Sequence, residues 1–89
     1  MNKERRTRLE KIIDKIQDIR MELEELMQDV EDVKYEEEEA RDNMPESLQE
    51  SDRYYTMDEN VDDLESATNV DWESPLDEIE EYLQNVVDR

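Results

Sequence analysis

Carboxylates are the side chains of this sequence whose number and spacing point most clearly to chemistry. Ten of them lie between Glu22 and Glu39, a stretch that measures about 26 Å as a helix at about 1.5 Å per residue. One carboxylate every ~2.6 Å is a denser row of charge than the phosphates of one DNA strand, which are about 3.4 Å apart. The ten residues are Glu22, Glu24, Glu25, Asp29, Glu31, Asp32, Glu36, Glu37, Glu38 and Glu39.

Catalysis and metal binding are two kinds of chemistry that carboxylates perform, and the sequence speaks against both. Acid–base catalysis by carboxylates needs a pair in a desolvated pocket, whereas this chain is only 34% hydrophobic and has no His and no Cys. Adjacent residues of Glu36–Glu39 diverge around a helix, so they do not converge on one ion. The segment Asp58–Asp63 resembles a calcium loop but lacks the Gly required at its sixth position. We therefore predict no enzymatic activity, no cofactor and no metal site.

Binding of a cationic partner is the remaining chemistry. We name as the acidic flank the carboxylates of Glu22–Glu39 together with those of Asp58–Glu65, which we expect to lie alongside. A helix that holds carboxylates three and four residues apart can occupy the basic cleft of a nucleic-acid-binding protein and exclude its nucleic acid. The alternative is that the charge only keeps a thin helical protein in solution. The candidate partner-binding residues are Glu22, Glu25, Asp29 and Asp32.

A heptad pattern predicts the helix that positions these carboxylates. Apolar residues spaced alternately three and four apart predict one long helix, 3–42, that packs along another helix. With Leu9 at heptad position a, Ile12 is at d, while Ile13 and Met27 at e widen the stripe beyond what one partner helix covers. The apolar residues at a and d are Leu9, Ile12, Ile16, Ile19, Leu23, Leu26, Val30 and Val33.

Proline and capping residues predict where the chain turns back. Pro45 ends the first helix, with one short helical turn expected after it, and Ser51 is an N-cap for a second helix. Ser74 and Pro75 indicate the N-cap and first residue of a third helix. We predict a single helical domain, 1–89, with a helix 3–42, a corner 43–50, a helix 52–70, a joint 71–74 and a helix 75–88.

The predicted fold is all-α: an antiparallel helical hairpin or coiled coil whose long first helix is covered by a kinked return arm of two helices. Met44 and Leu48 are expected to plug the end of the apolar seam. Because Ile13 and Met27 would remain incompletely covered, we expect a homodimer, either with a four-helix core or with the long helices paired directly. The return helices carry apolar residues at similar spacing, namely Tyr54, Met57, Val61 and Leu64, then Leu76, Ile79, Leu83 and Val86.

Basic residues are concentrated in a basic head, Met1–Arg20, which has seven Lys or Arg and four acidic residues. After Arg20, only four basic residues accompany 26 acidic ones, so direct binding of nucleic acid is not expected. The hairpin would place the acids of the third helix beside the basic head. No apolar run is long enough for a membrane span or a signal peptide, which predicts a soluble protein. The acids of the third helix that would lie beside the basic head are Asp77, Glu78, Glu80 and Glu81.

Three segments, together with the long heptad helix before them, resemble small acidic helical proteins of bacteriophages and prophages of Gram-positive bacteria. They are Asp42–Gln49 (DNMPESLQ), Ser51–Tyr54 (SDRY) and Val61–Glu65 (VDDLE), so that the resemblance extends to about Glu65. It implies a phage context and a location in the cytoplasm of the bacterial host cell, where small acidic phage proteins inhibit host defence or replication enzymes. By analogy we expect a non-enzymatic inhibitor of the anti-CRISPR or DNA-mimic type, whose target is a bacterial nucleic-acid-binding protein such as a CRISPR nuclease. The alternative is a coiled-coil assembly or adaptor protein of phage morphogenesis.

Overall fold

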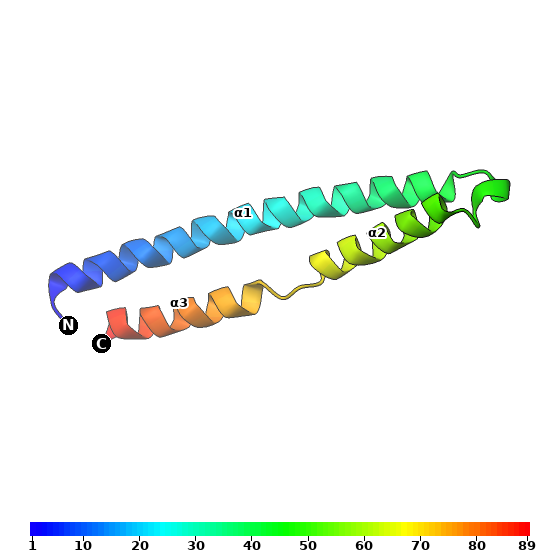
Figure 1. Ribbon diagram of the computed structural model, residues 1–89. Coiled ribbons are helices and arrows are strands. Elements are labelled where there is room, and N and C mark those ends of the chain that lie inside the picture. Colours follow the sequence, from blue (N-terminus) through cyan, green and yellow to red (C-terminus); the bar gives the residue numbers. More distant parts are fainter. The chain divides into compact units, whose positions relative to one another are not determined.

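The computed structural model describes all 89 residues, Met1–Arg89, and is built from helices alone (Figure 1). Helices account for 85% of the residues, and there are no strands. The long helix α1 (Lys3–Asp42) is followed by a short 3₁₀ turn, η1 (Glu46–Leu48), and by the two helices of the return arm, α2 (Asp52–Thr68) and α3 (Glu73–Asp88). The predicted all-α fold, with a long N-terminal helix and a two-helix arm packed against it, is confirmed.

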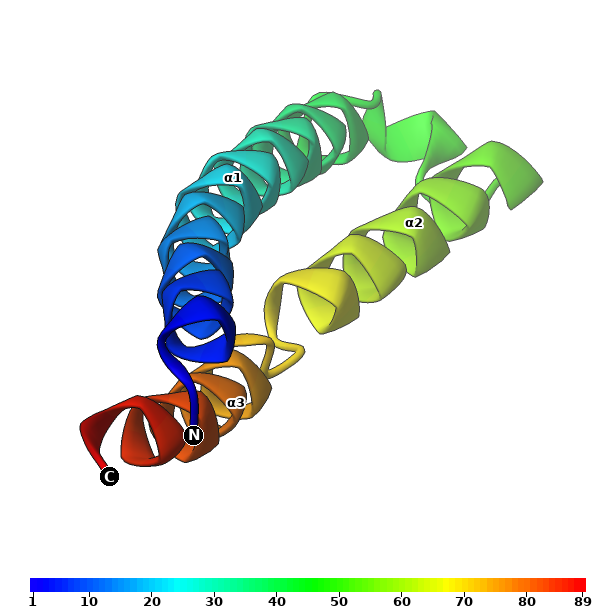
Figure 2. The same cartoon turned by 90° about the vertical axis from the view of Figure 1, so that its left-hand side faces the viewer.

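Packing divides the chain into two compact units. The first unit combines Met1–Glu24 with Asp71–Arg89, and the second is Glu25–Val70. In the first unit, α3 runs antiparallel to the beginning of α1 (Figures 1 and 2). In the second unit, α2 runs antiparallel to the end of α1 after the turn at η1. Each unit is therefore an antiparallel pair of helical segments.

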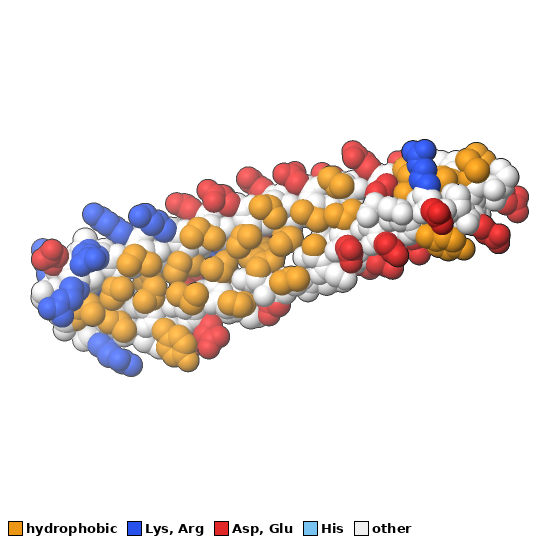
Figure 3. All heavy atoms as spheres, in the orientation of Figure 1, with side chains coloured by type: hydrophobic (Ala, Val, Ile, Leu, Met, Phe, Trp, Pro, Cys, Tyr) orange, Lys and Arg blue, Asp and Glu red, His pale blue; other side chains and the backbone are white.

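The side of α1 that the return arm covers differs from the expected one. The residues at a and e are covered: Ile13 and Ile16 are buried, and Met27 is half-buried. The residues at d remain open, so the prediction that Ile13 and Met27 lack cover is wrong. Figure 3 shows hydrophobic side chains gathered on one face over both α1 and α3 of the first unit. The open d residues, with their exposed fractions, are Ile12 (44%), Ile19 (44%), Leu26 (52%) and Val33 (51%).

Two arginines at position e explain why this side of α1 is covered. Arg20 forms ion pairs with Asp77 and Glu80 of α3. Arg41 pairs with Asp58 of α2, with 2.7 Å between its Nη1 and the carboxylate oxygen. These pairs form only when the e positions of α1 face the return arm, and in that orientation the d positions turn outward.

Two further apolar residues lie outside the contacts that the sequence predicted. Ile79, assigned to the seam of the third helix, is 50% exposed, and Leu48, expected to plug the seam, is 47% exposed, so both predictions are wrong. Val61 is buried, and the other apolar residues assigned to the second helix are half-buried, as expected. Only Ile13, Ile16 and Val61 are buried in the whole chain, so a single copy has a very small hydrophobic core.

The beginning of α2 follows the prediction. The Ser51 hydroxyl accepts a hydrogen bond from the Tyr54 backbone N–H at 3.3 Å, as expected of an N-cap, and η1 is the helical turn predicted after Pro45. The helix ends at Thr68, two residues before the predicted end. There the Thr68 hydroxyl donates to the Glu65 carbonyl at 2.8 Å. This local bond satisfies a carbonyl of the last turn.

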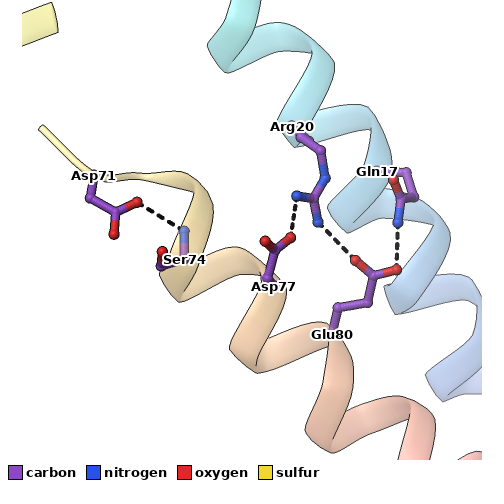
Figure 4. A network of polar contacts seen from close by, with 6 residues as sticks. All are labelled: Gln17, Arg20, Asp71, Ser74, Asp77 and Glu80. Carbon is purple, nitrogen blue, oxygen red and sulfur yellow. Dashed lines mark hydrogen bonds and ion pairs between the residues drawn. The ribbon is translucent and has the colours of Figure 1, made fainter. Parts of the chain in front are cut away.

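The beginning of α3 corrects the prediction of a Ser74 cap. The helix starts at Glu73, and the Asp71 carboxylate accepts a hydrogen bond from the Ser74 backbone N–H at 3.0 Å (Figure 4). Hydrogen bonds from Ser74, with a smaller contribution from the Glu73 backbone, lower the pKa of Asp71 below its ordinary value of 3.8. Pro75 is accommodated because the backbone N–H groups of a first helical turn have no partner inside the helix.

Candidate protein-interaction surface

The four candidate partner-binding residues all lie on α1, and all are exposed. Their spacing of three, four and three residues places them in two neighbouring rows at heptad positions g and c. Position g adjoins the open d residues, so a charged and an apolar row run side by side on α1. The two at g are Glu22 and Asp29, and the two at c are Glu25 and Asp32.

None of the ten carboxylates between Glu22 and Glu39 forms an ion pair. The ion pairs of the molecule use Arg20 and Arg41, whose acidic partners all lie outside this stretch. Seven of the ten side chains are exposed, and the other three are half-buried. Because no cation of the chain contacts them, their negative charge remains available to a partner.

Neutral side chains make the only hydrogen bonds to this row of carboxylates. The Gln28 amide donates to Asp32 at 3.1 Å, and the Asn60 amide of α2 donates to Glu37 at 3.0 Å. Neutral amides orient a carboxylate without cancelling its charge. The Asn60 bond also shows that α2 lies alongside α1 within the second unit, as the sequence predicted.

Tyr35 is an exposed aromatic residue inside the acidic row. Its hydroxyl donates a hydrogen bond to Glu31 at 3.1 Å, and its side chain is 54% exposed. This bond, together with the negative charge of Glu31, raises the pKa of Tyr35 above its ordinary value of 10.0. The Lys34 ammonium lies 5.0 Å from the centre of the Tyr35 ring, a distance typical of a cation–π contact.

The second part of the acidic flank, Asp58–Glu65, is only partly available. Asp58 is neutralised by Arg41. The pKa of Arg41 is raised mainly by its hydrogen bond to Asp42 and further by its hydrogen bond to Asp58. The remaining acids of this part, namely Glu59, Asp62, Asp63 and Glu65, are exposed and form no ion pair. The free charge is therefore concentrated on α1 and extended by α2.

Neither an enclosed cavity nor a converging set of ligands lies in the acidic flank. No three carboxylates come together as they would around a metal ion. A shallow hollow of about 240 Å³ lies instead at the N-terminal end of α1, lined by Met1, Arg5, Arg8, Leu9 and Ile12. None of the helices is both long and apolar enough to cross a membrane.

No family model, curated protein or solved structure matches this chain. Its function must therefore be inferred from its own residues and their arrangement.

A polar network in the first unit was only partly predicted. Arg20 bonds to both Asp77 and Glu80, 2.8 Å from the latter, and Gln17 donates to Glu80 as well (Figure 4). The hydrogen bond to Asp77 is the main cause that raises the pKa of Arg20. The acids of α3 thus reach the last cation of the basic head. The third helix therefore lies beside the basic head, as expected, although Arg20 is the one cation of the head that forms an ion pair.

Proposed function

We propose that this protein is a non-enzymatic modulator that binds the basic nucleic-acid-binding surface of a bacterial protein through its acidic flank. One observation carries the proposal: the ten carboxylates between Glu22 and Glu39 lie on one helix, and none of them forms an ion pair within the chain. Such a row attracts a surface that is built to hold phosphates.

The helix gives this row of charge a fixed spacing. Hydrogen-bonded backbone holds the carboxylates in place, so they lose less conformational entropy on binding than a flexible acidic tail does. Binding through exposed charges weakens as salt is added, because mobile ions screen them. The resemblance to small acidic phage proteins supports a target in host defence or replication, and a CRISPR nuclease is one candidate.

Capture from a bacterial lysate tests this function with a matched pair of variants. In the flank variant, three exposed acids at position c are neutralised, namely Glu25→Gln, Asp32→Asn and Glu39→Gln. In the control variant, three exposed acids elsewhere are neutralised, namely Asp14→Asn, Glu78→Gln and Glu81→Gln, which changes the net charge equally. We expect the wild type and the control to retain a nucleic-acid-binding protein at low salt, to release it at high salt, and to lose it to added duplex DNA.

Two results would count against the proposal. One is that immobilised wild-type protein retains no nucleic-acid-binding protein at low salt. The other is that the flank variant and the control variant retain the same proteins in equal amounts, since retention would then depend only on net charge.

A second candidate function, an assembly or adaptor protein, is favoured by the exposed aromatic residues. Tyr35 and Tyr55 are each 54% exposed, and aromatic side chains are frequent anchors of protein interfaces. In this case the acids serve solubility alone. Tyr35→Ala and Tyr55→Ala would then abolish partner capture, whereas the flank variant would capture as much as the wild type.

A further inference from the structure

The d residues of α1 form an apolar stripe that a single chain leaves open. We name Ile12, Ile19, Leu26 and Val33 the d stripe; their exposed fractions lie between 44% and 52%. They recur every seven residues of one helix, so they share one heptad position. Aliphatic side chains of this size lose favourable burial energy when half of their surface stays in water.

The return arm carries further open apolar side chains. In the first unit, Ile79 and Tyr82 of α3 are 50% and 65% exposed. Figure 3 shows that hydrophobic side chains of α1 and α3 gather on one face of this unit. With so few buried residues in the chain, the open side chains outnumber those of the core.

A row of charges at position g borders the d stripe. Its N-terminal members are basic and its C-terminal members are acidic; all are exposed and none forms an ion pair. Each residue of this row lies four residues before or three residues after a d residue, which makes the two rows neighbours on the helix. The row consists of Arg8, Lys15, Glu22, Asp29 and Glu36.

We propose that a second copy of this chain covers the d stripe, with the two α1 helices side by side and antiparallel. The stripe complements itself in this orientation. A two-fold axis between Ile19 and Leu26 sets Ile19 of one copy against Leu26 of the other, and Ile12 against Val33. All four residues of each stripe then gain an apolar neighbour at once.

Charge complementarity decides between the two possible orientations. In the antiparallel pair, Arg8 of one copy lies near Glu36 of the other, and Lys15 lies near Asp29. In a parallel pair, the g rows of the two copies would lie on opposite sides of the seam, so that none of these opposite charges would meet. Charges beside an apolar seam set the orientation of paired helices, and like charges in register are unfavourable.

This dimer is argued from other observations than the proposed function, although it engages the flank acids Asp29 and Glu36 at its edge. The acids at position c, among them Glu25 and Asp32, lie beyond the g row and stay open to solvent in the dimer. A dimer would present two such rows, one from each copy, running in opposite directions. The two tests stay distinguishable, because the lysate experiment changes acids at position c and the dimer experiment changes a residue at position d.

Light scattering coupled to size-exclusion chromatography, over a range of concentrations, tests the dimer. Leu26→Glu places a charge in the d stripe, and the control Met21→Glu places one at a residue that is 62% exposed and lies at position f, away from the stripe. We expect dimers of wild type and of Met21→Glu, and monomers of Leu26→Glu with unchanged helix content by circular dichroism. A monomeric wild-type protein, including one whose stripe takes up a foreign helix instead, would overturn the proposal.

Disulfide trapping tests the orientation, and the absence of native Cys makes its result unambiguous. A mixture of the single variants Ile12→Cys and Val33→Cys should form a cross-linked heterodimer under mild oxidation. Ile12→Cys alone should not cross-link, because its two copies in an antiparallel pair are about 30 Å apart, far beyond the reach of a disulfide. Efficient cross-linking of Ile12→Cys to itself would indicate a parallel pair and contradict the proposal.

Discussion

Replacing Ile16 and Ile19 by alanine, one at a time, compares the covered and the open side of α1. Ile16 is 6% exposed and Ile19 is 44% exposed, and they lie three residues apart on the same helix. Both substitutions remove the same atoms and change helix propensity equally, so the difference reflects burial alone. Truncating a buried Ile to Ala costs about 2 to 3 kcal/mol in a site that can partly collapse. A side chain that keeps almost half of its surface in water should lose about 1 kcal/mol.

Urea unfolding followed by circular dichroism measures both costs. At a protein concentration where the chain is monomeric, we expect Ile16→Ala to be more destabilising than Ile19→Ala by about 1 to 2 kcal/mol. At a concentration about a hundredfold higher, the dimer buries Ile19, and the cost of Ile19→Ala should approach that of Ile16→Ala. Equal costs at low concentration would refute the assignment of the covered side. A cost of Ile19→Ala that is independent of concentration would refute burial of this residue in a dimer.

Three other predictions concern caps and pH. Ser51→Ala removes the N-cap of α2 and should cost about 1 kcal/mol, which lowers Tm by about 4 to 8 °C in a thermal scan. The hydrogen bond from Ser74 lowers the pKa of Asp71 in the folded protein. The stability that this carboxylate supplies is therefore complete above its ordinary pKa of 3.8 and is lost as the pH falls through the lower folded pKa. Asp71→Ala should be less stable than the wild type at neutral pH and equally stable in strong acid. Because Glu31 raises the pKa of Tyr35, the Tyr35 phenol should ionise above pH 10.0 in an absorbance titration. Its pKa should be lower in Glu31→Gln. An unchanged titration would show that the hydrogen bond between Tyr35 and Glu31 does not form in solution.

The heptad pattern predicted the long helix correctly because eight consecutive a and d residues are apolar. It could not predict which side of α1 is covered. Position a is common to both choices. Burial alone favours d, where Ile12, Ile19, Leu26 and Val33 are all apolar, over e, where only Ile13 and Met27 are. Arg20 decides the question through its bonds to Asp77 and Glu80, residues that are distant in sequence. A heptad count that considers only apolar residues misses such long-range polar pairs.

The boundaries of the return arm show a similar limit. A Ser followed by Pro is a strong local indication of a helix start, and it misplaced the N-cap of α3 at Ser74. Asp71 performs the capping instead, since its carboxylate reaches the Ser74 N–H and the helix gains the residues before Pro75. Competing caps within one joint differ by amounts too small to rank from residue type alone. The acidic flank was easier to predict, because exposure of a charged row on a helix follows directly from its spacing.

Competition between this protein and duplex DNA for a captured partner tests the proposed function most directly. The measurement is the fraction of partner bound to labelled DNA as unlabelled wild-type protein is added at low salt. We predict that DNA is released, that the flank variant with Glu25→Gln, Asp32→Asn and Glu39→Gln needs about tenfold more protein for the same release, and that the equally charged control variant behaves as the wild type does. A ternary complex in which the partner keeps its DNA, or equal potency of the two variants, would contradict binding through the acidic flank.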